Sequence, residues 1–529
     1  MAITERSGPP VNAGSDAPAS TLDSGDRQRV ARAGMWTAAG FVVSATVSPA
    51  LTVVLVRVLP ASAYASLVTA TAVVTLAAAL TGFGLSAAVA RAMAQASIPG
   101  TAAGPETTYV TARRLVAQLC AAAAVVAVVA VAVVQAVPAL RPAIGPLVVM
   151  LPAIVLAPVL GFGTGLARAG FAGRTIAAAS AVPSLVVAVL ALLALATGSR
   201  SPLVIAGARV SGAVAAVAVV VHYLARNRPR GPGLRAVGAS PIIRRQMAAF
   251  AGAMLLAVFL GSAISQLDVV VLAAVRGGRA AADYAPVSRV ADALMALPPL
   301  LGTFFLPAVT RSIAGGEREH TARLYHWASR WNLVVCAPAL GVAMAVPRSV
   351  LDLLFGAGYG AFGGPLRILA AGVAANVLLG FNGITLDAYG MPGKVAIRQG
   401  AAIAVDVVAC IALVPVWGLT GAAAATTIGL VVANLLCSWV LYARFRVGPW
   451  DRAVVVTVVA AVAATTAVAA SVPRLVGSDL ARIVVAGLVV ALVTGVAAVA
   501  SGGAGERNAI VAQARRRAGA ISTRLGHER

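Results

Sequence analysis

Residues 115–138 read LVAQLCAAAAVVAVVAVAVVQAVP, a run without a single charged side chain. At 1.5 Å per residue, a helix of about 20 such residues crosses the ~30 Å hydrocarbon core of a bilayer. Apolar runs of similar length recur along nearly the whole chain, separated by short polar connections. The run therefore indicates a transmembrane helix, and its repetition predicts a protein built almost entirely from such helices.

The composition supports the same interpretation. The chain has 529 residues, of which 60% are hydrophobic and 11% charged, and its mean hydropathy is +0.92. A soluble globular protein carries about 25% charged residues. A soluble chain this apolar would lack the polar side chains to cover its surface. We therefore expect an all-α integral membrane protein.

The formal net charge of +24 would suggest nucleic-acid binding in a soluble protein, but the positions of the charges argue against it. Apart from Lys394, the basic residues are arginines, and most lie in short connections between apolar runs. Positive residues in such loops orient the helices and meet anionic lipid headgroups. We expect anionic membrane lipids as partners and no nucleic acid.

About fourteen spans with both termini in the cytoplasm place most of the 41 basic residues on one side of the cytoplasmic membrane. This agrees with the positive-inside rule, and an odd number of spans would scramble the segregation. The expected spans are 34–57, 64–90, 115–138, 144–166, 176–197, 202–224, 249–275, 285–308, 329–347, 366–389, 396–416, 419–442, 453–472 and 481–500.

A long basic loop at about residues 225–248 divides the chain after six spans. Because six is even, the next six spans enter the membrane in the same orientation, as parallel repeats do. A weak internal sequence similarity supports this division: VRVLPASAYASL at 56–67 resembles VRGGRAAADYAPV at 275–287. The predicted parts are a disordered cytoplasmic tail (1–27), an N-terminal six-helix lobe (28–230), a C-terminal six-helix lobe (231–447), two extra transmembrane helices (448–502) and a basic cytoplasmic tail (503–529).

Three local features add detail. The first 27 residues lack periodicity and an h-region, so they predict a retained disordered tail and no signal peptide. Pro415 and Gly418, in VPVWGLTGAAAATTIGL, predict a tight turn between antiparallel helices. The segment ERNAIVAQARRRAG near the C-terminus fits either a basic helix on the inner leaflet or a solvated tail.

Catalytic and cofactor motifs are lacking in the sequence. Cys120, Cys336, Cys410 and Cys437 each lie inside an apolar run without a CxxC pair, which predicts buried thiols and no metal site. GFGTGLARAG at 161–170 ends a span and follows no strand, so it favours close helix packing over a nucleotide loop. No paired-carboxylate, Ser-His-Asp or HExxH arrangement is present. We expect neither an enzyme nor a cofactor.

Polar residues at membrane depth are the candidates for function. Asp268 lies about seven residues inside one expected span, and Arg289 and Asp292 enter the next span at comparable depth. A charged residue costs about 2.5–3.5 kcal/mol at the centre of a membrane helix, so it normally has a partner or faces a wet cavity. Asp268 and Arg289 are therefore either functional or an ion pair that locks helices together. Further candidates are Arg57, Asn382, Asp387 and Asp406.

The stretch SQLDVVVLAAVRGGRAAADYAPVSRVADALMALPPLLGTFFLPAV resembles the central segment of the polysaccharide-export, Wzx-like flippases of the MATE/MOP superfamily. Asp268, Tyr284, Arg289 and Pro307 occupy the positions of that family's pattern. LDAYGMPGKVAIRQGAAIAVDVVACIALVPVWGLTGAAAATTIGLVVANLL is similar to the family's C-terminal module, and LVRVLPASAYASL and TGFGLSAAVAR resemble its N-terminal segments. The resemblance covers roughly residues 30–445.

The resemblance implies two six-helix lobes around a central cavity that opens alternately to either side. It implies a flippase that moves a polyprenyl-linked saccharide from the inner to the outer leaflet, with a polysaccharide polymerase or glycosyltransferases as possible partners. The substrate-binding hypothesis names Arg289, Asp268, Asp292, Arg57 and Asn382, and the ion-coupling hypothesis names Asp268 and Asp406. Open alternatives are a lipid II flippase of the MurJ type, a MATE-like small-molecule antiporter and a membrane scaffold.

Overall fold

A computed structural model describes residues 24–97, 104–227, 238–264 and 266–502. All regular elements within these ranges are helical. The N-terminal elements are α1 (Ser24–Val58), α2 (Ala61–Ala96), α3 (Pro105–Ala136), η1 (Pro138–Ala143), α4 (Ile144–Ala169), α5 (Gly173–Ala196) and α6 (Pro202–Asn227). They are followed by α7 (Pro241–Ile264), α8 (Leu267–Arg276), α9 (Gly278–Met295), α10 (Pro298–Ala314), α11 (Arg318–Ala345), α12 (Pro347–Phe355) and η2 (Tyr359–Phe362). The C-terminal elements are α13 (Gly363–Leu379), α14 (Asn382–Ala388), α15 (Pro392–Trp417), α16 (Leu419–Phe445), α17 (Arg452–Leu475) and α18 (Asp479–Ser501).

The predicted all-α, multi-pass membrane fold is confirmed. Within the described ranges, 12 helical segments are long and apolar enough to cross a membrane. The expected spans 249–275 and 285–308 are not among them. Each of these two spans is divided between two shorter helices, α7 and α8 in the first and α9 and α10 in the second. The count of fourteen therefore stays a prediction.

The broken spans have local causes. Pro298 and Pro299 open α10, and proline at the start of a helix cannot continue the hydrogen bonding of the preceding one. Gly380 adopts a φ of 69°, which glycine tolerates, and it separates α13 from α14 within the expected span 366–389. Gly418, with a φ of 55°, joins α15 to α16 and confirms the predicted tight turn.

Close packing in the N-terminal half depends on glycines. A Cβ added to Gly165 would lie 2.7 Å from the carbonyl oxygen of Ser86, and one added to Gly161 would lie 2.6 Å from that of Gly82. Because glycine has no Cβ, the backbones of α4 and α2 can approach each other closely at both positions. GFGTGLARAG is thus helical through Ala169, as the packing interpretation predicted, and it forms no nucleotide loop.

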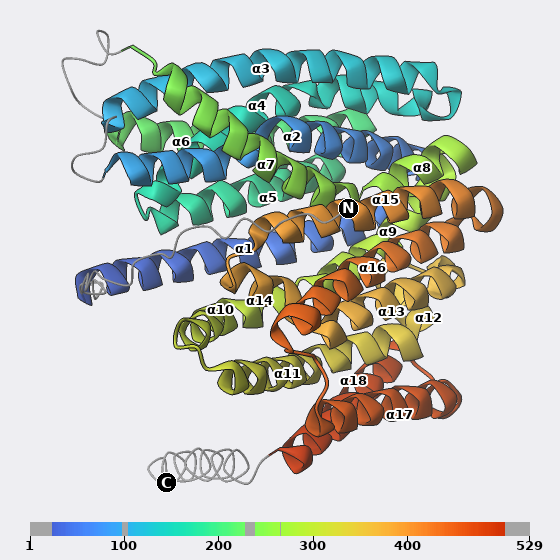
Figure 1. Cartoon of the computed structure of the whole chain (residues 1–529). Helices are drawn as coiled ribbons and strands as arrows, with labels where there is room; N and C mark the ends of the chain where they lie inside the picture. The colour runs from blue at the N-terminus through green and yellow to red at the C-terminus, as the bar shows by residue number, and fades with distance from the viewer. Residues whose placement is uncertain (1–23, 98–103, 228–237, 265, 503–529) are drawn as a thin grey trace, which may run out of the picture.

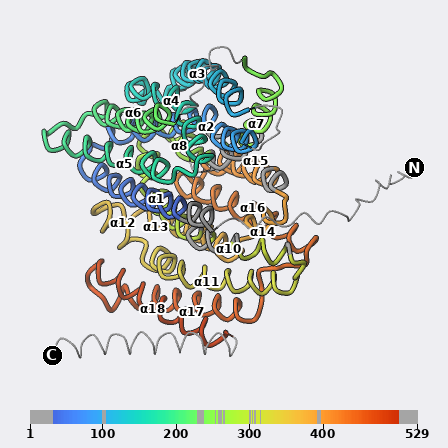
Figure 2. Tube along the Cα trace, turned by 90° about the vertical axis from the view of Figure 1, so that its left-hand side faces the viewer, coloured from blue at the N-terminus to red at the C-terminus, as the bar shows by residue number. Residues whose placement is uncertain are grey.

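Figures 1 and 2 show two groups of helices, with α2–α6 on one side and α10–α18 on the other. The extra pair α17 and α18 packs on α11 at the edge of the second group. The helix α7 packs mainly on α2, although the expected boundary at residue 231 assigned it to the C-terminal lobe. The helix α7 ends at Ile264 and packs with the N-terminal group, whereas α8, which begins at Leu267, packs with α9 and α15.

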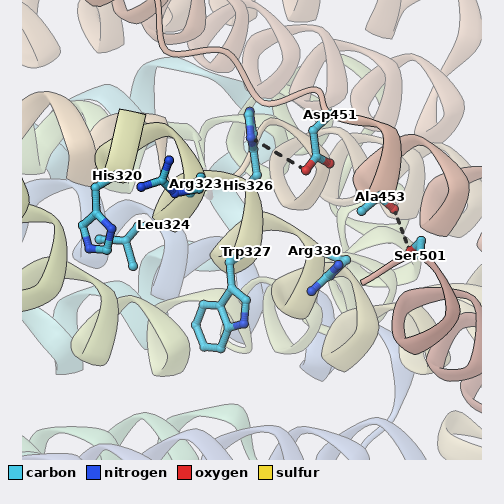
Figure 3. Close-up of a pocket in the computed structure, with 9 residues that line it drawn as sticks. All are labelled: His320, Arg323, Leu324, His326, Trp327, Arg330, Asp451, Ala453 and Ser501. Atoms are coloured by element: carbon cyan, nitrogen blue, oxygen red, sulfur yellow. Dashed lines mark hydrogen bonds and ion pairs between the residues drawn. The ribbon is translucent and has the colours of Figure 1, made fainter. Parts of the chain in front are cut away.

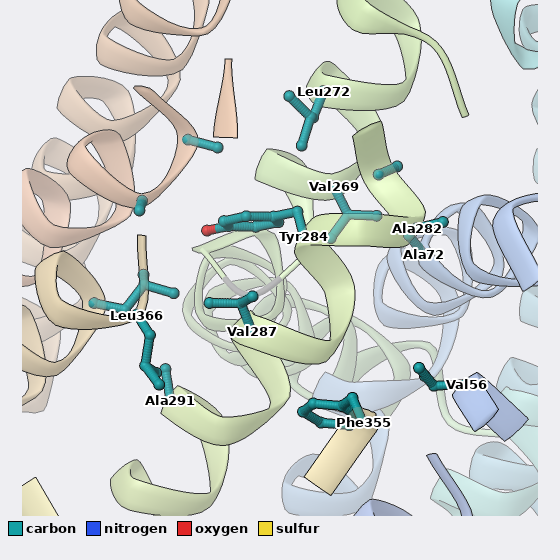
Figure 4. Packing of buried hydrophobic residues seen from close by; sticks show 14 of the residues in the cluster. Val56, Ala72, Val269, Leu272, Ala282, Tyr284, Val287, Ala291, Phe355 and Leu366 are labelled. Atoms are coloured by element: carbon teal, nitrogen blue, oxygen red, sulfur yellow. The ribbon is translucent and has the colours of Figure 1, made fainter. Parts of the chain in front are cut away.

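The two groups meet along α9. Figure 4 shows Tyr284, Val287 and Ala291 of α9 close to Leu366 of α13, with Ala72 of α2 and Val56 of α1 on the opposite side. These residues belong to one continuous apolar core. The helix that carries Arg289 is therefore packed between both halves of the molecule.

One expected boundary was wrong. The helix α1 begins at Ser24, so residues 24–27 are helical and do not belong to a disordered tail. Polar and charged residues extend this helix by several residues beyond the apolar run on which the boundary was based. The rest of the predicted N-terminal tail and the basic tail 503–529 lie outside the described residues.

Candidate functional site

Asp268 is a buried carboxylate held by three donors. It lies in the first turn of α8 and is 2% exposed. Its Oδ2 accepts hydrogen bonds from the Tyr284 hydroxyl at 2.8 Å and the Thr426 hydroxyl at 3.3 Å, and its Oδ1 accepts one from the Val269 amide at 2.7 Å. Tyr284 itself is completely buried in the core of Figure 4. Asp268 thereby links α8, α9 and α16.

Arg289 does not form the ion pair with Asp268 that the sequence left open. Its Nη1 donates to Asp292 Oδ2 at 2.8 Å, three residues along α9, and its Nη2 lies 3.5 Å from Gln266 Oε1. Residues three apart share a helix face, so this partner is the one that the backbone favours. The side chains of Arg289 and Asp292 remain 33% and 40% exposed, respectively. The pair is therefore accessible to a ligand.

Asp268 and Asp292 also line one small cavity of about 100 Å³. Thr426 of α16 and Ser288 of α9 contribute hydroxyl groups to it. Because Asp292 is the partner of Arg289, the cavity lies between the Arg289–Asp292 pair and the buried carboxylate of Asp268.

Arg209, which was not among the sequence candidates, is the second arginine of the site. It lies in α6, and its fully buried Nε has no hydrogen-bond partner among the described residues. It interacts electrostatically with Arg289 and with Tyr64 of α2, and no acidic residue in the described part of the chain offsets its charge. An arginine inside the expected span 202–224, which contains no acid, is the signal that would have identified it.

Asp406 is the second buried carboxylate. It is completely buried on α15, and neither of its oxygens has a partner within the part of the chain that the structure describes. A Cβ added to Gly429 of α16 would lie 2.8 Å from the Cβ of Asp406, so this glycine permits the close approach of the two helices. Asp406 and Asp268 are near enough to interact electrostatically.

Asn382 is engaged in helix packing. Its Nδ2 donates to the backbone oxygen of Asn434 at 3.0 Å and to the Ser438 hydroxyl at 3.0 Å, which ties α14 to α16. Asn434 in turn donates to Asn376 of α13 at 3.0 Å. Asp387 is exposed near the end of α14. The structure brings neither Asn382 nor Asp387 into the group around Arg289.

Arg57 joins the two halves at another point. It lies in the last turn of α1, and its guanidinium donates to the carbonyl oxygens of Leu353 and Leu354 near the end of α12. The bond from Nε to Leu354 is 2.8 Å long. Terminal helix carbonyls lack intrahelical partners, and arginine satisfies them well. Arg57 thus holds α1 against α12 and lies outside the group around Arg289.

The charged residues of the site offer two kinds of binding group, one for anions and one for cations. Arg209 and Arg289 offer planar guanidinium groups that bind an oxyanion such as phosphate through paired hydrogen bonds. Asp268 and Asp406 offer buried carboxylates that suit a cation. Within the described ranges, no cluster of three or more His, Cys, Asp or Glu side chains could hold a metal ion, and the four cysteines are free.

The family model described as "Polysaccharide biosynthesis protein" matches residues 30–311, just over half of the chain. The lipid II flippase MurJ, in an inward closed conformation, superposes with a TM-score of 0.67 at 10% identity, covering 87% of this chain and 98% of its own. An inward-facing multidrug resistance MATE transporter of the MOP superfamily gives 0.63 at 16% identity, covering 78% and 98%. A MOP superfamily transporter from Pyrococcus furiosus gives 0.55 at 16% identity, covering 79% and 96%.

No curated protein matches the chain. The solved structures nevertheless share its fold over most of their length, which confirms the predicted MATE/MOP architecture. The chain belongs to the polysaccharide biosynthesis protein family and has the fold of the MATE/MOP transporter superfamily.

Proposed function

We propose that this protein is a flippase that moves a polyprenyl-linked saccharide from the inner to the outer leaflet of the cytoplasmic membrane. Both termini face the cytoplasm, as the distribution of basic residues predicts. The cargo carries phosphate groups between its lipid and its sugar. The family membership and the flippase and transporter folds of the solved neighbours support this proposal.

The observation that carries the proposal is the uncompensated positive charge at Arg209 and Arg289. Of the two neighbouring arginines, Arg289 has one carboxylate partner, Asp292, and Arg209 has none among the described residues. Like charges at low dielectric repel each other, and a buried charge without a partner is unfavourable. A bound phosphate relieves both problems, because its oxygens accept hydrogen bonds from both guanidinium groups. Tyr64 supplies a further hydroxyl beside them.

The buried carboxylates fit ion coupling. Asp406 has no donor for either oxygen in the described chain, and Asp268 lies near it with the Thr426 hydroxyl. A proton or a monovalent cation bound there would neutralise the buried charge. Because Asp268 also contacts Tyr284 of α9, occupancy of this site can influence the helix that carries Arg289. We infer that cation binding and cargo binding are coupled through α9.

The test is deletion of the gene followed by analysis of lipid-linked intermediates. The proposal predicts accumulation of a polyprenyl-linked oligosaccharide and loss of the corresponding surface polysaccharide. Neighbouring genes for glycosyltransferases and a polymerase would agree with this pathway. Unchanged lipid-linked intermediates together with altered drug tolerance would refute the proposal in favour of a small-molecule antiporter.

A lipid II flippase is the second candidate, favoured by one observation. The MurJ structure covers 87% of this chain, compared with 78% and 79% for the two other transporters described above. The same deletion distinguishes the two cargoes. Accumulated peptidoglycan precursor and loss of cell-wall integrity would identify lipid II, and an accumulated oligosaccharide with intact peptidoglycan would exclude it.

A further inference from the structure

The two similar segments of the sequence, 56–67 and 275–287, meet in the structure. The first contains the start of α2 at Ala61, and the second contains the start of α9 at Gly278. A Cβ added to Gly278 would lie 3.6 Å from the Cβ of Ala65, so the two helix starts are in contact. Both lie at the end of the molecule that the distribution of basic residues predicts to face the outside.

A cavity of about 320 Å³ lies between these helix starts and η1. The helix α2 contributes the hydroxyl groups of Ser62, Ser66 and Thr69, and α9 contributes Gly278 and Arg279. The residues of η1 that line the cavity are apolar. None of the residues assigned to the candidate functional site lines it, so this cavity is a separate place in the fold.

Both helices begin at the cavity without a side-chain cap. The first bonded amides are those of Tyr64, which donates to the carbonyl oxygen of Pro60 at 2.9 Å, and of Ala280, which donates to that of Gly277 at 3.2 Å. The amides that precede them have no partner within the described chain. Free amides and the helix dipole together make a helix start favourable for an anion. Here two such starts line one cavity.

A buried hydroxyl group at the cavity supports the same interpretation. Ser62, Ser66 and Thr69 follow one another at intervals of four and three residues, which places them on one face of α2. Thr69 is 2% exposed, and its hydroxyl has no hydrogen-bond partner among the described residues. A buried donor without an acceptor is unfavourable. An acceptor bound in the cavity would remove this cost.

Arg279 adds a positive charge at the same place. Its Nε lies 3.3 Å and 3.4 Å from the two carboxylate oxygens of Asp283, one turn further along α9. The Arg279 side chain is 73% exposed, and ion pairs this exposed are weak. The two terminal nitrogens of Arg279 form no hydrogen bond in the part of the chain that the structure describes. They are therefore available to a ligand.

The cavity differs in its polar groups from the larger cavity between α11, α17 and α18. That cavity, of about 400 Å³, includes Asp451, which lies 3.8 Å from His326 Nδ1 (Figure 3). The cavity at the helix starts has no carboxylate among its lining residues. Its polar groups are amides, hydroxyls and a guanidinium, all of which donate hydrogen bonds. Such a set of donors favours an oxyanion.

We propose that this cavity binds a phosphate group between the two lobes. The amides at the starts of α2 and α9, the Thr69 hydroxyl and the Arg279 guanidinium donate hydrogen bonds to the phosphate oxygens. Because α2 belongs to the N-terminal group and α9 to the predicted C-terminal lobe, a bound phosphate holds the lobes together at this end. Inorganic phosphate and the diphosphate of a lipid-linked saccharide share this chemistry, and only the second source rests on the proposed function.

The experiment measures the thermal unfolding temperature of the purified full-length protein in detergent. Potassium phosphate is compared with potassium chloride at equal ionic strength, and farnesyl diphosphate is compared with farnesol. A ligand that binds only the folded protein raises its unfolding temperature. At least one phosphate ligand should stabilise wild type relative to its control. Tighter binding of farnesyl diphosphate would identify a lipid-linked source, and tighter binding of phosphate would identify the inorganic anion.

Two variants and a matched control locate the binding. Arg279→Gln and Thr69→Val should each raise the dissociation constant about tenfold, because each removes a hydrogen bond to a charged oxygen. Without phosphate, Thr69→Val should be as stable as wild type, since it keeps the side-chain shape and removes a hydroxyl that has no partner in the described chain. Arg200→Gln removes the same charge from an exposed position between α5 and α6, outside the cavity, and should bind as wild type does.

Arg209→Gln separates this cavity from the candidate functional site, and stabilisation by inorganic phosphate should remain in this variant. A phosphate effect that is lost in Arg209→Gln but intact in Arg279→Gln and Thr69→Val would overturn the proposal and leave the proposed function standing. Equal binding by Arg279→Gln, Thr69→Val and Arg200→Gln would also overturn it, as would the absence of stabilisation of wild type by either phosphate ligand. Diphosphate binding that Arg279→Gln weakens and Arg209→Gln leaves unchanged would support this cavity and count against the proposed function.

Discussion

Replacement of Arg209 by glutamine separates cargo binding from folding. Because no ion pair in the described chain includes Arg209, the substitution leaves no carboxylate without its partner. It also removes a buried charge that neighbours Arg289, so the protein should be at least as stable as wild type. Hydrogen bonds to charged groups contribute about 1.5–3 kcal/mol. Loss of the Arg209 contact should therefore weaken binding of a polyprenyl diphosphate roughly tenfold to hundredfold.

The assay titrates a polyprenyl diphosphate into purified protein and measures the thermal unfolding temperature in parallel. Arg474→Gln, an exposed position on α17, is the control for a loss of charge. Arg289→Gln should weaken binding similarly but lower stability, because it leaves Asp292 without its partner. The double variant Arg289→Gln/Asp292→Asn should recover stability without recovering binding. Wild-type affinity in Arg209→Gln, or an Arg209→Gln protein that fails to fold, would refute the reasoning.

Four further substitutions examine other contacts. Asp406→Asn should keep or raise the unfolding temperature, because a buried carboxylate without a partner in the described chain is unfavourable. The same substitution should abolish the dependence of transport on an ion gradient. A transport rate that still follows the gradient would exclude a role of Asp406 in ion coupling. Arg57→Ala should weaken the contact between α1 and α12 by about 1–3 kcal/mol, because it removes the hydrogen bonds to the carbonyl oxygens of Leu353 and Leu354. Spin labels on α1 and α12 would report this change as a longer and broader distance distribution. An unchanged distribution would show that these carbonyl contacts are dispensable. Tyr284→Phe should lower stability by about 1–3 kcal/mol because Asp268 loses a donor at 2.8 Å, and Thr426→Val, which removes a donor at 3.3 Å, should have the smaller effect in the same unfolding measurement.

The fold was predictable because the lipid environment restricts the backbone so strongly. A segment such as 115–138 has no alternative to a membrane-spanning helix, and α3 extends over nearly all of it. The breaks were harder to predict, because apolar content continues through them. The interruption between α9 and α10 depends on Pro298 and Pro299, and prolines elsewhere, such as Pro152, remain inside a helix. The path of α7 along α2 depends on tertiary packing that no local pattern encodes.

The site was predictable in part, because a charged residue at membrane depth is conspicuous in the sequence. Asp268, Arg289 and Asp292 were identified in this way and lie close together in the structure. Their pairing was not evident, since Tyr284 and Thr426 reach Asp268 from α9 and α16 while Arg289 uses a neighbour on its own helix.

Two candidates from the sequence have other contacts. The amide of Asn382 is engaged by Asn434 and Ser438, and the guanidinium of Arg57 binds the end of α12. Both are polar residues near or inside expected spans, and only three-dimensional contacts distinguish such residues from those that face a ligand. Arg209 satisfies the same sequence criterion as Asp268, but its importance depends on Arg289, which lies 80 positions further along the chain.

The most direct measurement is translocation by purified protein in proteoliposomes. A fluorescent polyprenyl diphosphate-linked saccharide is incorporated into both leaflets, and an enzyme outside the vesicles removes the sugar from the accessible lipid. Wild-type protein should make nearly all of the substrate accessible, whereas Arg209→Gln and the double variant Arg289→Gln/Asp292→Asn should leave the inner-leaflet fraction protected. Protection of that fraction in wild-type vesicles, or full accessibility with both arginine variants, would contradict the account.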